Sequence, residues 1–182
     1  MGKQDFEKFL QGQTGSTQKA TFDAEAEMAF WRGELSKLYN SVRDWLSEYE
    51  DKITLSFDDI SIYEKPFGTY TVKSATIYLG NKKAHLKPIG TNIIGTPGRV
   101  DLIGPVGTIK LVLADILATG PNILIEEFTS EADRLQKEAK RKEKASRPID
   151  WVWKATTPPP RLKYTTLTQD IFLDCLMSVL DA

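Results

Sequence analysis

The apolar positions between residues 21 and 50 recur at alternating steps of three and four. They are Met28, Trp31, Leu35, Leu38, Val42, Trp45 and Tyr49. This spacing places all of them on one stripe of an α-helix, so we predict a helix over 21–50 with Thr21 as its cap. The stripe has two interpretations. It packs on the protein's own sheet, or, because it also fits a coiled-coil seam, it pairs with a partner helix or a second copy.

Between residues 52 and 128 the apolar positions alternate with polar ones, which predicts a series of β-strands that includes one at 121–128. In the first two strands the alternation changes phase midway. In the first of them the change falls at Asp58-Asp59, which predicts a β-bulge there and a strongly curved sheet. Clusters of Gly, Pro and Asn separate the strands, and such short connections favour antiparallel pairing of consecutive strands.

The C-terminal part of the chain contains a polar, basic connector over 129–148 and then a strand over 150–155. Three consecutive prolines, at 158–160, predict an extended segment without strand pairing. An amphipathic helix follows over 166–180, and the spacing of Thr166 and Gln169 is that of a capping box.

These elements predict an α+β fold. We expect a curved antiparallel β-meander, or a partly closed barrel, of about six to eight short strands flanked by the two helices. A length of 182 residues suits a single domain, which we place at 21–182. Residues 1–20 are expected to form a short helix and a flexible, glycine-containing connector outside that domain.

Composition narrows the classes of partner. The formal net charge of −1 argues against bulk attraction to nucleic acid or to anionic lipid. The longest apolar runs are far shorter than the roughly 20 residues that span a bilayer, so we expect no membrane association. A single cysteine excludes an intrachain disulfide, and the N-terminus lacks the apolar core of a signal peptide, so we expect a cytoplasmic protein.

The sequence identifies no catalytic residue, metal site or cofactor. One histidine and one cysteine, His85 and Cys175, are too few for a zinc site within one chain. We expect His85 to face water, because it lies between Ala84 and Leu86 in a short strand. Motifs for phosphate, dinucleotide or nucleophilic chemistry are absent from the sequence.

The most polarised segment is 134–147, with seven basic residues against two acidic ones. Its central cluster consists of Lys140, Arg141, Lys142 and Lys144. Such a cluster could follow a phosphate backbone, but the segment lacks the interleaved aromatic residues that support nucleic-acid binding. Nucleic-acid binding is therefore our second alternative and not the leading hypothesis.

The leading hypothesis is a non-enzymatic protein-binding or adaptor module whose partner is another protein or a second copy, as in a homodimer. The candidate interaction residues are Trp31, Leu35, Trp45, Trp151, Trp153, Pro158, Pro159 and Pro160. Tryptophan is a frequent anchor of protein interfaces, and polyproline segments dock in aromatic grooves or cover a sheet edge. The first alternative is a ligand-binding or hydrolytic barrel with a carboxylate-based site. It would use Arg99 and Asp101, although we expect these two to form a solvent-side pair.

Overall fold

The structure is a computed structural model that describes residues 23–91, 93, 96–121, 130–132, 134–136, 139 and 146–181. The helical elements are α2 (Ala24–Leu46), the 3-10 helix η1 (Ser47–Tyr49) and α4 (Gln169–Leu180). The strands are β1 (Ile53–Glu64), β2 (Gly68–Leu79), β3 (Lys82–Gly90), β4 (Arg99–Ile103), β5 (Thr108–Asp115), β6 (Trp151–Thr156) and β7 (Tyr164–Thr166).

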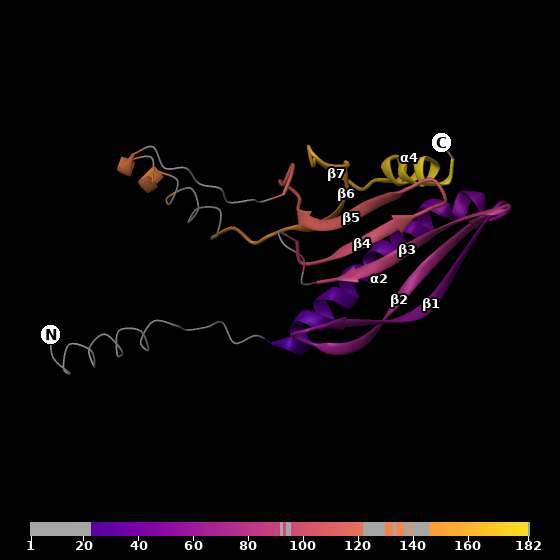
Figure 1. Cartoon of the computed structure of the whole chain (residues 1–182), viewed down its shortest axis with the longest axis horizontal. Helices are drawn as coiled ribbons and strands as arrows, with labels where there is room; N and C mark the ends of the chain where they lie inside the picture. Colours follow the sequence, from indigo (N-terminus) through magenta and orange to yellow (C-terminus); the bar gives the residue numbers. More distant parts are fainter. Residues whose placement is uncertain are drawn as a thin grey trace.

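The strands form one seven-stranded antiparallel sheet in chain order from β1 to β7. The sheet is open, so β1 and β7 are its two edges (Figure 1). Helices α2 and α4 pack against the sheet and against each other, and the rings of Trp45 and Phe172 lie 5.5 Å apart. The predicted α+β meander is thereby confirmed.

The core lies between α2, α4 and one face of the sheet. Successive strands contribute Ile77, Leu86, Leu102 and Leu111, all fully buried. These residues stand opposite one another or at alternate positions in the strand register, as one face of a pleated sheet requires. The apolar stripe of α2 fills the other side of this layer.

Trp31 is the largest of the fully buried side chains. Its ring lies 6.2 Å from that of Trp153 on β6, and the Trp153 indole Nε1 donates a 3.0 Å hydrogen bond to the Glu34 carbonyl oxygen of α2. The stripe therefore packs on the protein's own sheet, the first of its two interpretations.

The prediction of a β-bulge at Asp58-Asp59 is wrong. β1 and β2 pair one-to-one over all 12 residues of each strand, without a register shift. Both strands change phase at the same level: the Phe57–Ala75 pair lies before the change, and the Ile60–Val72 pair follows it. A β-bulge places two residues of one strand opposite a single residue of its partner. Because both strands change phase at the same level, their residues can remain paired one-to-one and no bulge is needed.

The β1–β2 hairpin separates from the rest of the sheet at the level of this change of phase. Pairing between β2 and β3 stops at Ala75 and Leu86, so the distal half of the β1–β2 hairpin bends away from β3 (Figure 1). Helix α2 supports the bend. The ring of Tyr39 lies 5.5 Å from that of Phe57, and its hydroxyl donates a 2.6 Å hydrogen bond to the Lys73 carbonyl oxygen.

Both helix starts differ from the prediction. Asp23 caps α2 by accepting from the Ala26 amide, and Thr168 caps α4 by accepting from the Ile171 amide. Thr166, the expected cap of the second helix, instead belongs to β7, a strand that the sequence did not reveal. The segment 1–20 and almost all of the strand expected at 121–128 lie outside the described residues.

Gly98 permits the close approach of β4 to α2. A Cβ added there would lie 2.5 Å from the Trp31 ring, and the ring cannot retreat from the core. We expect Gly98→Ala to lower the free energy of unfolding by about 1–3 kcal/mol, measured by urea denaturation. Gly107→Ala is the control, because its Cβ would meet nothing within 4 Å. Equal midpoints for the two variants would contradict this packing.

Candidate functional site

The tryptophans and the leucine that we proposed as interaction residues pack in or against the protein's own core. Trp31 and Leu35 are buried, and Trp153 is buried on β6. Trp45 and Trp151 are half-buried against Phe172 and Phe30, respectively. None of these five candidates offers a broad open surface to a partner.

The three prolines lie on an exposed loop between β6 and β7. Thr157 closes the loop: its hydroxyl donates to the Arg161 carbonyl oxygen at 2.6 Å and accepts from the Lys163 amide at 2.8 Å. Beside it, the Tyr164 amide donates to the Thr119 carbonyl oxygen at 2.9 Å. The edge formed by β7 is therefore only 3 residues long and has a second segment of the chain against it.

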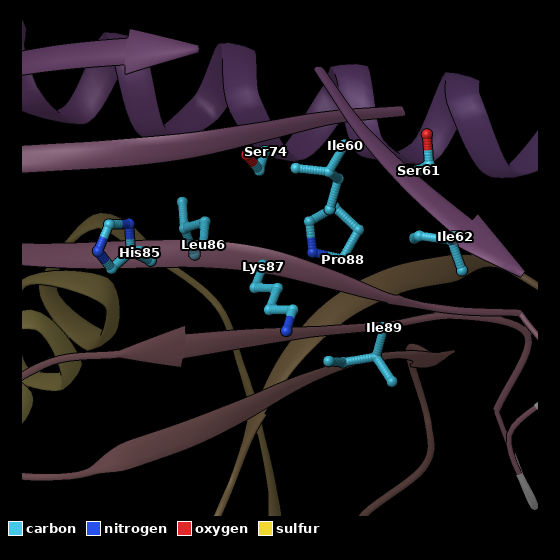
Figure 2. A pocket seen from close by; sticks show the side chains of 9 residues that line it. All are labelled: Ile60, Ser61, Ile62, Ser74, His85, Leu86, Lys87, Pro88 and Ile89. Atoms are coloured by element: carbon cyan, nitrogen blue, oxygen red, sulfur yellow. The ribbon is translucent and has the colours of Figure 1, made fainter. Parts of the chain in front are cut away.

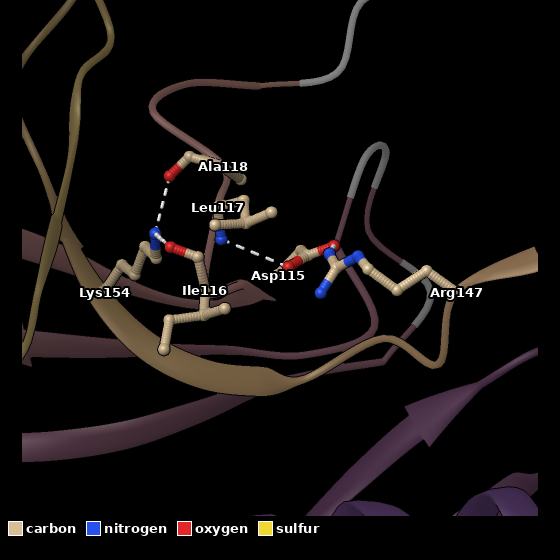
Figure 3. A network of polar contacts seen from close by, with 6 residues as sticks. All are labelled: Asp115, Ile116, Leu117, Ala118, Arg147 and Lys154. Carbon is tan, nitrogen blue, oxygen red and sulfur yellow. Dashed lines mark hydrogen bonds and ion pairs between the residues drawn. The ribbon is translucent and has the colours of Figure 1, made fainter. Parts of the chain in front are cut away.

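A buried lysine holds that second segment in place. Lys154 is only 3% exposed, and its ammonium donates to the carbonyl oxygens of Ile116 and Ala118 at 2.8 and 2.6 Å (Figure 3). Asp115, just before them, accepts from the Arg147 guanidinium and from the Leu117 amide. These contacts fix the segment after β5 against β6, which is a structural role.

The hydrogen bond from Arg147 is the main reason why the pKa of Asp115 lies below its ordinary value. A depressed pKa means that the carboxylate contributes stability above its ordinary pKa and loses this contribution as the pH falls through the folded-state pKa.

The potentially reactive side chains are far apart or already engaged. His85 faces away from the core, as predicted, but is half-buried, and its Nδ1 shares a 3.0 Å hydrogen bond with the Thr76 hydroxyl. Arg99 donates from two nitrogens to the Asp101 carboxylate, each at 2.7 Å. The pair forms as expected, yet Asp101 is only 7% exposed. Cys175 lies in the core, where burial raises the pKa of its thiol.

A groove of about 450 Å³ opens where the β1–β2 hairpin departs from β3 (Figure 2). Its lining residues are Ile60, Ser61, Ile62, Ser74, His85, Leu86, Lys87, Pro88 and Ile89. Beyond the groove, the Glu64 carboxylate accepts hydrogen bonds from the hydroxyl of Thr91, at 2.7 Å, and from its amide; Thr91 directly follows β3. The lining is mostly aliphatic, includes Lys87 and His85, and contains no carboxylate. Sequence reasoning missed the groove because it arises from the bend of the hairpin.

The outer edge of β1, on the side away from β2, is the longer of the two edges of the sheet. β1 is 12 residues long and contains no proline, lysine or arginine. No described strand pairs with this edge. Edge strands are normally kept from pairing by shortness, proline, charged side chains or a bulge. β1 is long and has no proline or bulge, and its only charged residues are the acids Asp58, Asp59 and Glu64. We call this side of the strand the β1 edge.

Comparisons with known proteins supply no identity: no family model, no curated protein and no solved structure matches the chain.

Within the described part of the chain, no group of three or more His, Cys, Asp or Glu side chains could hold a metal ion. Among the same residues, no helix is long and apolar enough to cross a membrane. The basic candidates Lys140, Arg141, Lys142 and Lys144 lie outside the described residues.

The ion pair of Asp115 gives a prediction for pH titration. Arg147→Gln removes the charged donor, so the pKa of Asp115 should rise towards its ordinary value, measured by the carboxyl carbon shift in an NMR titration. Arg161→Gln, a charge change on the exposed proline loop, is the control and should leave that titration unchanged. An identical Asp115 titration in wild type and Arg147→Gln would show that the bond does not form in solution.

Proposed function

We propose that this chain is a non-enzymatic protein-binding module that takes up an extended segment of a partner protein as an additional strand beside β1. The observation on which the proposal rests is the β1 edge, a 12-residue edge strand without proline, lysine or a bulge. Strand addition draws its affinity from main-chain hydrogen bonds and its specificity from alternate side chains.

The backbone of β1 supports this mode of binding. In an antiparallel pair, alternate residues of an edge strand direct their N–H and C=O groups away from the neighbouring strand, so β1 offers about six residues for pairing. The other edge, β7, has 3 residues and lies against the segment that Lys154 holds in place. The two edges therefore differ in both length and access.

The side chains of β1 give a second reason. Its apolar residues remain only partly buried, although they pack against the core; they are Ile53, Leu55, Phe57, Ile60 and Ile62. The residues opposite them on β2 include Ala75 and Ile77, which are almost fully buried. An additional strand would cover the exposed sides of the β1 residues, and burial of this kind contributes about 25 cal/mol per Å² of apolar surface.

The groove adjoins the same strand. Ile60, Ser61 and Ile62 belong to β1 and also line the groove, so a strand added along the β1 edge would pass beside it. A side chain of the partner could then contact the aliphatic residues that line the groove, and an acidic side chain could form an ion pair with Lys87.

The alternatives have less structural support. A hydrolytic or ligand-binding barrel needs an enclosed interior, and this sheet is open. The carboxylate of Asp101, its candidate group, is engaged by Arg99. Nucleic-acid binding would depend on basic residues outside the described part of the chain. A protein partner in the cytoplasm, the location expected from the sequence, remains part of the proposal.

The chain itself supplies a probe. A synthetic peptide with the sequence of residues 68–79 copies β2, which already pairs with all 12 residues of β1. We expect it to bind the intact protein and to shift and protect the amides of Ile53–Glu64 in NMR spectra, while those of Tyr164–Thr166 stay unchanged. A scrambled peptide of identical composition is the control. Absence of binding by the β2 peptide, or shifts confined to residues away from β1, would overturn the proposal.

A further inference from the structure

The middle of β1 carries two adjacent carboxylates. Asp58 and Asp59 are the sixth and seventh residues of the 12-residue strand, and β1 contains no basic residue. Asp59 forms a 2.7 Å ion pair with Lys73 of β2. The exposed carboxylate of Asp58 forms no ion pair with any described residue.

These positions oppose pairing of the β1 edge with a second copy of itself. Antiparallel pairing of two identical strands is two-fold symmetric. Directly opposite residues of paired strands project to the same face of the sheet, so this symmetry pairs even-numbered residues with even-numbered ones and odd-numbered with odd-numbered. The two registers with the greatest overlap therefore set Asp58 against Asp58, or Asp59 against Asp59. Like charges directly opposite on neighbouring strands destabilise the pair.

The β1–β2 hairpin shows which type of residue pairs with these carboxylates. β2 contains one basic residue, Lys73, and the register places it directly opposite Asp59. The residue of β2 opposite Asp58 is Ser74, which leaves that carboxylate without a cation. A strand on the free side of β1 would meet the unpaired charge of Asp58 directly.

We propose that Asp58 and Asp59 select the occupant of the β1 edge: a strand of a different protein with Lys or Arg opposite Asp58, and not a second copy of this chain. This inference rests on the proposed strand addition. Repulsion between copies keeps the β1 edge vacant, and the same carboxylates attract a basic strand. Asp58 is the specificity-determining residue because Asp59 is already engaged by Lys73.

The first experiment measures self-association of the full chain by light scattering over a concentration series. Wild type should be monomeric, whereas the double variant Asp58→Ser, Asp59→Ser should form a dimer, since the repulsion is gone. The double variant Glu48→Ser, Asp51→Ser removes the same charge from exposed positions outside β1 and should stay monomeric. Circular dichroism verifies folding, which should survive the loss of the Asp59–Lys73 pair because exposed ion pairs contribute little to stability. A wild-type dimer paired through β1, or a folded Asp58/Asp59 variant that remains monomeric, would overturn the inference.

The second experiment separates this inference from strand addition itself. Two peptides copying residues 68–79 carry Ser74→Lys or Ser74→Glu, so that a basic or an acidic residue meets Asp58. We expect the lysine peptide to bind wild type about tenfold more tightly than the glutamate peptide, and Asp58→Lys to reverse the order. Equal binding of both peptides would overturn the charge selection and leave strand addition standing. Binding of neither peptide would overturn the proposed function.

Discussion

The contact between α2 and the sheet is the interaction on which the rest of the structure depends. At one end of the helix, Trp31 packs on Trp153 of β6, and the Trp153 indole N–H is bonded to the α2 backbone. Further along, Tyr39 reaches β2 and is bonded to its backbone at the bend. One helix thus spans the sheet from β6 to β2 and sets the curvature between them. Helices α2 and α4 both pack against the core face of the sheet, and β1 forms one of its two edges (Figure 1).

The fold was largely predictable from local periodicity, but the relations between strands were not. The helical stripe of α2 and the alternation in the strands are properties of single segments, and they gave the α+β meander correctly. The phase change at Asp58-Asp59 was visible too, but its meaning depended on whether β2 changes phase at the same level. Thr166 failed as a helix cap because β7 uses it, and that strand depends on a long-range pairing with β6.

The candidate site was less predictable for the same reason. From the sequence we favoured tryptophans and prolines, residue types that are frequent at interfaces. The structure buries two of the four tryptophans in the core and packs the other two against it. No local pattern shows that a strand will be an edge, so β1 was expected only as one strand among several. The groove beside Ser61 likewise arises from a bend between segments. What the sequence does show, once the edge is known, is a strand without proline or lysine and with two central acids.

The polar groups with the strongest local contacts serve the fold. Lys154 bonds two carbonyl oxygens, Asp101 is engaged by Arg99, and His85 shares a hydrogen bond with Thr76. The backbone of the β1 edge differs from them because no described strand pairs with its outer side. This contrast favours recognition of a partner's backbone over chemistry at a side chain.

The most direct measurement is amide hydrogen exchange along Ile53–Glu64 in the isolated protein at low concentration. An edge strand that is free on one side protects alternate amides, those bonded to β2, and leaves the intervening ones exchanging rapidly. We predict this alternating pattern of amide exchange along β1. The β4 amides should exchange slowly, because β4 is paired on both sides. Uniformly slow exchange through all 12 residues of β1 would show that something already covers the edge, and would contradict the account.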